Sequence, residues 1–222
     1  AKETRSSFLI EREEPGRARE ERFIAVLRDA GKVPIEQALT LERLVALQNT
    51  LVDPRYAEKT YRQIQNYVGA TLPGVREQIH YITVPPALVL SLMSGLAATA
   101  NRLESVSPVV QAAVTGFLFV FIHPFEDGNG RLARALAEKC LAEGLGHPVL
   151  IALSATIHRG RKSYYEMLEQ ANKRNEVTEW LEYFAEAILA ATLLVFLFAY
   201  LNLNRWHVRA SHVASVWLMF LV

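Results

Sequence analysis

Apolar residues recur at spacings of three and four along most of the chain, and short polar segments separate these runs. This periodicity is typical of amphipathic helices with one side facing a core. Helix-breaking residues mark several of the ends, among them Pro15-Gly16, Gly31 and Asp53-Pro54. The predicted helices cover residues 1–13, 17–30, 35–52, 87–100, 109–122, a segment after residue 130, a segment within 148–175, and 179–202.

Residues 78–84 have a different pattern, because isoleucine, tyrosine, threonine and valine are concentrated there and Pro85-Pro86 closes the run. β-Branched and aromatic residues in such a run favour a strand. This is the strongest strand prediction in the chain. The sequence therefore predicts a largely helical domain with one small β element.

A polar loop separates two of the predicted helices. It reads His-Pro-Phe-Glu-Asp-Gly-Asn-Gly-Arg over residues 123–131, and Arg134 follows within one helical turn. Ser107-Pro108 begins the helix before the loop, because serine caps a helix and proline fits its first position. Apolar residues at helical spacing follow from Leu132 onward. The loop is therefore predicted to join two helices.

The second half of this loop has the features of an anion site. Gly128 and Gly130 can adopt positive φ angles and leave backbone N–H groups uncovered. Such groups at the start of a helix attract anions, and the helix dipole adds to the attraction. Arg131 and Arg134 lie three residues apart, so both guanidinium groups can turn toward one anion. This end of the loop is predicted to bind phosphate.

Two further residues of the loop add chemistry to the anion site. The carboxylate of Asp127 suits a Mg²⁺ ion shared with phosphates. The imidazole of His123 has a pKa that suits a general base near neutral pH. Each feature alone is most often structural, because Asp-Gly-Asn-Gly runs commonly form surface turns. As a set they indicate transfer of a phosphate-bearing group from a nucleotide.

The pattern His-Pro-Phe-x-Asp-Gly-Asn-Gly-Arg-x-x-Arg resembles the motif of the Fic family, whose members are mostly protein adenylyltransferases. The resemblance extends from about residue 6 to about residue 200. It implies an all-α, Fic-type helical domain with one small β-hairpin flap, expected at about residues 76–84. It also implies transfer of AMP from ATP, with Mg²⁺, to a Ser, Thr or Tyr hydroxyl of a target protein docked on the flap.

The resemblance implies a role for each residue of the motif. His123 is the expected catalytic base and Asp127 the expected metal ligand. The expected nucleotide-binding residues of the motif are Gly128, Asn129, Gly130, Arg131 and Arg134. Related proteins line the adenine and ribose pocket with a Tyr and an Asn seven residues apart, and Tyr165 and Asn172 have that spacing.

The N-terminal segment Ser7-Phe8-Leu9-Ile10-Glu11 resembles the family's inhibitory helix, Ser/Thr-x-x-x-Glu-Gly/Asn. Arg12 stands where that pattern has Gly or Asn. The resemblance implies that Glu11 pairs with Arg134 and takes the place of the γ-phosphate of ATP. Without it, the residues alone favour a surface helix that carries an ordinary exposed glutamate.

Composition limits the organisation and the partners. The 222 residues, 51% of them hydrophobic, suit one domain with a sizeable core. We expect an inhibitory helix and turn at 1–16, a Fic domain at 17–200 and a helical extension at 201–222. A net charge of +1 gives no electrostatic case for a nucleic-acid or membrane partner. The single Cys140 and the polar N-terminus favour the cytoplasm, and both monomer and homodimer stay open.

Other functions stay open at this stage. The same site can work in reverse as a deadenylylase, can transfer phosphate or phosphocholine, or can belong to a non-enzymatic nucleotide-binding module. A zinc hydrolase is disfavoured because the chain has no HExxH or paired-cysteine pattern. A P-loop ATPase is disfavoured because no GxxxxGK[ST] segment occurs.

Overall fold

A computed structural model of the chain describes residues 2–28, 32–72, 76–146, 153–174, 176–194, 197 and 200. These residues form helices and one antiparallel two-stranded sheet, which confirms the predicted all-α fold with a small β-hairpin. The elements are α1 (Lys2–Ile10), α2 (Arg17–Arg28), α3 (Ile35–Ala38), α4 (Leu41–Leu51), η2 (Pro54–Tyr56), β1 (Tyr67–Leu72), β2 (Arg76–Ile82), α5 (Pro86–Leu103), α6 (Pro108–Ile122), α7 (Asn129–Leu145), α8 (Leu153–Arg159) and α9 (Arg161–Arg174). Residues 178–194 are also helical.

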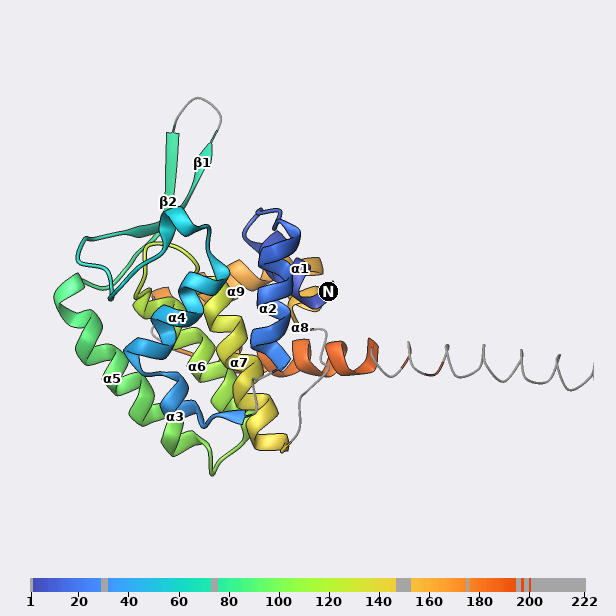
Figure 1. The fold of residues 1–222 in the computed structure, drawn as a ribbon. Helices are drawn as coiled ribbons and strands as arrows, with labels where there is room; N and C mark the ends of the chain where they lie inside the picture. The colour runs from blue at the N-terminus through green and yellow to red at the C-terminus, as the bar shows by residue number, and fades with distance from the viewer. Residues whose placement is uncertain are drawn as a thin grey trace, which may run out of the picture.

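Helix α6 precedes the polar loop and α7 follows it. The two helices pack against each other at the centre of the fold (Figure 1). As predicted, α6 begins with Ser107 at its N-cap and Pro108 at its first position. The helix at 178–194 packs on α6 through Trp180, whose indole N–H donates to the carbonyl of Ala113 at 2.9 Å. None of the described helices combines the length and hydropathy needed to cross a membrane.

Helix α1 is part of the core. Its side chains Phe8 and Ile10 are fully buried, and the Phe8 ring packs edge-on against Phe23 of α2. The carboxylate of Glu3 accepts hydrogen bonds from two backbone N–H groups in the first turn of α8, those of Ser154 and Ala155. The N-terminal segment is therefore fixed against the domain by both apolar packing and a helix cap.

The hairpin of β1 and β2 projects from the helical body (Figure 1), with Tyr67 opposite Ile82. The predicted flap at 76–84 covers only its second strand, so that boundary was wrong. The first strand was missed because glycine and alanine interrupt residues 67–72 and lower their strand propensity. Tyr81 anchors the hairpin on α6, since its hydroxyl donates to the carbonyl of Phe121 at 2.8 Å.

Three predicted helices have different boundaries in the structure. Residues 35–52 form two helices, because Thr40, at the N-cap position of α4, has an extended backbone that interrupts the helix. Residues 148–175 contain α8 and α9, which Gly160 separates. The last helix was predicted at 179–202, and the described residues 178–194 are helical. The predicted extension at 201–222 lies outside the described residues.

We expect Phe125→Ala to destabilise the domain, because Phe125 is fully buried and packs against Tyr61 with ring centroids 5.7 Å apart. Deleting such a side chain typically lowers the free energy of unfolding by about 3–5 kcal/mol. Urea unfolding followed by circular dichroism measures the change. The control is Glu126→Ala at the exposed neighbouring position, which should stay within about 0.5 kcal/mol. Equal stabilities for the two variants would contradict this role of Phe125.

Candidate active site

His123 lies at the C-terminal end of α6 in a left-handed backbone conformation, with φ 54°. This geometry turns the chain into the loop and lets the His123 N–H donate to the Phe119 carbonyl at 3.0 Å. Its ring Nδ1 lies 3.0 Å from the Val120 carbonyl. A carbonyl can only accept, so we assign the proton to Nδ1, which leaves Nε2 as the acceptor. His123 lines a cavity together with Glu11 and Gly130.

The surroundings of His123 favour its neutral form. Burial lowers the pKa of this imidazole, because the charged form would lose its hydration, and the nearby cation of Arg62 acts in the same direction. The Val120 carbonyl and the carboxylates of Glu11 and Asp127 oppose this shift without reversing it. A neutral imidazole near pH 7 can accept a proton.

Side chains from within the loop and from two other segments hold the loop backbone. Asn129 accepts from the Phe125 N–H at 3.0 Å and donates to the Phe125 carbonyl at 2.8 Å. Asn66 donates to the same carbonyl, and Gln48 donates to the carbonyl of Asp127. Asn129 is only 2% exposed. Its side chain, predicted to bind nucleotide, therefore closes the loop on itself in this structure.

The predicted anion site at the start of α7 contains a carboxylate from the chain itself. Gly128, the N-cap of α7, has φ 89°, a conformation that favours glycine. Gly130 lies so close to Glu11 that a Cβ at this position would be 2.3 Å from Glu11 Oε1. The Glu11 carboxylate therefore lies against the first turn of α7, where N–H groups and the helix dipole favour negative charge.

Arg134 faces the end of α1 with its whole guanidinium group. Its Nη1 lies 2.9 Å from Glu11 Oε1, its Nε donates to Ser7 Oγ at 2.9 Å, and its Nη2 donates to the Ser7 carbonyl at 2.7 Å. The residue is 3% exposed. Tyr165 contacts the other carboxylate oxygen, since its hydroxyl lies 3.4 Å from Glu11 Oε2. The sequence-predicted residues Ser7, Glu11, Arg134 and Tyr165 thus meet at one point.

Two residues after the end of α1, Arg12 has φ 58° although it carries a side chain. The Arg12 N–H donates to Leu9 and the Glu13 N–H donates to Phe8, which is the hydrogen-bond pattern of a Schellman cap. A Gly or Asn at this position suits the same conformation, because both tolerate positive φ more readily. The exit from the helix is therefore preserved, with some backbone strain at Arg12.

Arg131, which was predicted to bind phosphate, pairs in this structure with groups of the chain itself. Its guanidinium forms an ion pair with Glu13, donates to the Leu51 carbonyl at 3.3 Å and donates to Asp127 Oδ1 at 2.8 Å. Sequence reasoning missed Glu13, which sits just past the α1 cap and also pairs with Arg19. In this structure Arg131 ties the loop to the segment after α1.

Asp127 offers limited coordination for a metal ion. Its Oδ1 already accepts from Arg131 and from the Gly128 N–H at 2.7 Å. Within the described residues, no group of three His, Cys, Asp or Glu side chains could hold a metal by itself. A single carboxylate nevertheless fits Mg²⁺, which commonly takes one or two protein oxygens and completes its shell with phosphates and water.

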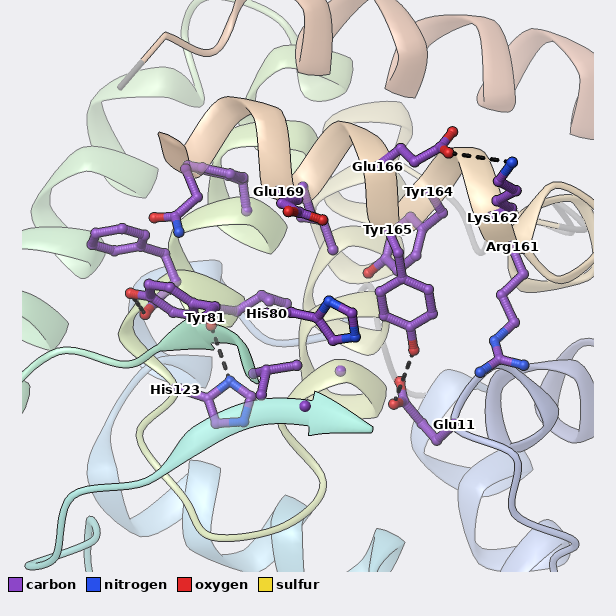
Figure 2. Close-up of a pocket in the computed structure, with 18 of the residues that line it drawn as sticks. Glu11, His80, Tyr81, His123, Arg161, Lys162, Tyr164, Tyr165, Glu166 and Glu169 are labelled. Atoms are coloured by element: carbon purple, nitrogen blue, oxygen red, sulfur yellow. Dashed lines mark hydrogen bonds and ion pairs between the residues drawn. The ribbon is translucent and has the colours of Figure 1, made fainter. Parts of the chain in front are cut away.

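A cavity of about 750 Å³ lies between the flap, the motif loop and α9 (Figure 2). Tyr165 and Asn172, predicted from their spacing, both line it together with His123. Figure 2 shows Tyr165 pointing toward Glu11 from α9. His80 of the flap, to which the sequence analysis assigned no role, also lines the cavity, as does Arg161. Only knowledge of the hairpin could have placed His80 there.

The family model and the similar proteins that comparison finds all carry the name Fic. The sequence model of the Fic/DOC family matches residues 38–141. The chain is 42% identical over 69 residues to a protein named protein adenylyltransferase Fic from Nematostella vectensis, an alignment that covers 31% of this chain and 15% of that protein. A protein of the same name from Culex quinquefasciatus is 31% identical over 140 residues, which is 61% of this chain and 25% of the relative. The chain thus spans a quarter or less of the length of these two relatives.

Solved structures share the fold. A crystal structure of a Fic family protein from Desulfovibrio desulfuricans G20 superposes with a TM-score of 0.72 and 21% sequence identity. The match covers 90% of this chain and 66% of the other. At this identity the likeness establishes the helical architecture. Together with the motif at 123–134, this likeness agrees with the family model, which identifies a Fic/DOC domain within residues 38–141 of the chain.

Proposed function

We propose that this chain is the catalytic domain of a protein adenylyltransferase, which transfers AMP from ATP to a Ser, Thr or Tyr hydroxyl of a target protein. One observation carries the proposal: the carboxylate of Glu11 lies against Gly130 and Arg134, at a helix N-terminus suited to phosphate. A neutral histidine with a free ring nitrogen lines the same cavity. The names of the curated relatives support this activity.

The cavity suggests where the nucleotide binds. The phosphates lie along the N-terminal turn of α7, on the backbone N–H groups of Asn129 and Gly130, because the Gly128 N–H already donates to Asp127. The base and ribose lie toward Tyr165 and Asn172, which line the same cavity on α9. Because Arg131 is held by Glu13 and Asp127, we assign it to positioning Asp127, and Arg134 remains the cation for the γ-phosphate. When Mg²⁺ is bound, Asp127 holds it, and the ion offsets charge on the phosphates.

The transfer step uses His123 as the base. The target hydroxyl donates its proton to His123 Nε2 while its oxygen forms a bond to the α-phosphorus of ATP. The bond from that phosphorus to the bridging oxygen of pyrophosphate breaks, and pyrophosphate leaves. General base catalysis of this kind contributes roughly 10²–10⁴-fold in rate. The N–H groups of the loop stabilise the charge that develops on the transferred phosphate.

Glu11 inhibits the reaction in this proposal. Its carboxylate pairs with Arg134 at 2.9 Å and takes the position that the γ-phosphate would require. Two like charges cannot share one guanidinium at that distance without repulsion, so ATP binds in a geometry that does not suit attack. Ser7 supports the inhibited state, because its hydroxyl and carbonyl occupy the other donors of Arg134.

The target segment binds on the flap. Val68, Gly69 and His80 of the hairpin line the cavity, so a strand added to the hairpin would pass directly beside His123. Main-chain hydrogen bonds supply affinity in this mode of recognition and leave the sequence of the target free to vary. This arrangement would bring a hydroxyl side chain to the reacting phosphorus.

We expect Glu11→Gly to raise the incorporation of label from α-³²P-ATP into protein by about tenfold or more. An arginine free to contact the transferring phosphates can contribute on the order of 10³–10⁵ in rate. Glu11→Gly combined with His123→Ala should lose the label. The matched control is Glu14→Gly, which removes an exposed glutamate three residues further on.

The mass of the adduct on the modified protein distinguishes adenylylation from the alternative activities. An adduct mass equal to AMP supports adenylylation, whereas the mass of phosphate or phosphocholine overturns it. Removal of AMP from a premodified target, lost on Glu11→Gly, would indicate that the site works as a deadenylylase. ATP binding without transfer in Glu11→Gly would favour a non-enzymatic nucleotide-binding module.

The pH dependence of transfer tests the role of His123. Burial lowers the pKa of this imidazole, so the base stays neutral to a pH below the ordinary value of about 6.5. We expect the acid limb of the kcat/KM profile of Glu11→Gly to be centred below 6.5, since kcat/KM reports the free enzyme and protonation of His123 stops the reaction. Thermal melting at each pH serves as the control for folding. A limb centred above 6.5 would rule out a buried His123 as the base.

A further inference from the structure

Arg62 is buried in the segment that leads into the flap, and within the described residues its side chain donates its hydrogen bonds to backbone carbonyls. It is only 2% exposed. Its Nε donates to the carbonyl of His123 at 2.7 Å, and its Nη2 donates to the carbonyls of Val84 at 2.5 Å and Ile122 at 3.3 Å. Its Nη1 donates to the carbonyl of Ile64 at 2.9 Å. No carboxylate among the described residues lies within ion-pair distance of it.

These contacts complete the C-terminal end of α6. The last carbonyls of a helix have no partner within the helix and need one elsewhere. Here the Phe119 carbonyl accepts from the His123 N–H, that of Val120 from the His123 ring, and that of Phe121 from Tyr81. Arg62 supplies the donors for the next two carbonyls, those of residues 122 and 123. The Arg62 N–H also donates to the carbonyl of Pro124 at 2.9 Å.

We infer that Arg62 is the positioning residue for His123, and that one guanidinium group fixes both the catalytic histidine and the base of the flap. The inference rests on the proposed function of His123. Since Arg62 holds the carbonyls on either side of the left-handed turn, it fixes the direction in which the imidazole leaves the backbone. The Val84 contact joins the end of the flap to the same group. The same guanidinium group therefore influences both the docking of the target on the flap and the placement of His123.

Only arginine can make this set of contacts. Its planar group carries five N–H donors in a fixed fork, whereas lysine has a single ammonium group on a flexible chain. The positive charge also offsets the negative end of the α6 dipole, which lies beside His123. Glu11, Asp127 and Arg62 are the charged groups that act on this imidazole. Among these three charged groups, only the Arg62 cation disfavours the imidazolium, and the loss of Arg62 removes that effect.

The test compares Arg62→Lys and Arg62→Gln in the Glu11→Gly background, with Arg55→Gln as control at an exposed arginine of the same region. Since Arg62 does not contact the nucleotide cavity, we expect kcat per folded molecule to fall by roughly 10²-fold with KM for ATP nearly unchanged. A displacement of about 1 Å can have an effect of this size. Arg55→Gln should match the parent. A lowered melting temperature with kcat unchanged would overturn the inference.

Two measurements do not depend on transfer. NMR titration of His123 should give a higher pKa in Arg62→Gln than in the wild type, because a nearby cation has been removed; an unchanged pKa would overturn the inference. In the wild type, the Arg62 Nε–H should exchange slowly with solvent and should show scalar coupling to the His123 carbonyl across their hydrogen bond. This measurement needs no variant, so it tests the inference even if the variants do not fold. Absence of that coupling would also overturn it. If Glu11→Gly transfers no label at all, the proposed function fails, while these two measurements still decide the role of Arg62.

Discussion

The contact between the Glu11 carboxylate and the Arg134 guanidinium, against the first turn of α7, is the interaction on which the functional account depends. Arg134 is almost fully buried, and a buried charge without a partner is costly, on the order of 3–5 kcal/mol when one partner of a buried pair is removed. The site therefore requires an anion. In this structure the chain supplies it from α1, and in catalysis a phosphate would take its place.

The same need to satisfy buried polar groups explains how the motif loop is held in place. The loop is short and irregular, so its backbone groups cannot pair with each other as they do in a helix. Gln48, Asn66 and Asn129 supply donors from the side chains around it. Arg62 does the same at the end of α6. These contacts hold His123 and the first turn of α7 in a defined geometry, which the proposed catalysis by preorganised groups requires.

Much of this arrangement could be predicted from the sequence. The helix–loop–helix around His123 follows from an apolar periodicity, a Ser-Pro start and two glycines, all of which are local signals. Glu11 and Ser7 were predicted through the family resemblance and do meet Arg134 in the structure. Periodicity alone would have left Glu11 on a surface helix, because nothing local shows that α1 folds back over α7.

Other features depend on contacts that form only in the folded chain. Arg131 was predicted to bind phosphate, and in this structure it pairs with Glu13, which is far away in sequence. The side chain of Asn129, predicted to bind nucleotide, bonds here to the backbone of Phe125. The strand β1 was missed because its Gly and Ala residues depend on pairing with β2 for their conformation. The role of Arg62 was not predicted, because its side chain donates to backbone carbonyls, and every residue has a carbonyl whatever its type.

The most direct test of the central claim is a crystal structure of Glu11→Gly soaked with a non-hydrolysable ATP analogue. The account predicts the γ-phosphate on Arg134 beside Gly130, in the place that the Glu11 carboxylate has now, with His123 Nε2 facing the α-phosphorus. A triphosphate bound away from α7, with Arg134 still enclosed by Ser7 alone, would contradict it.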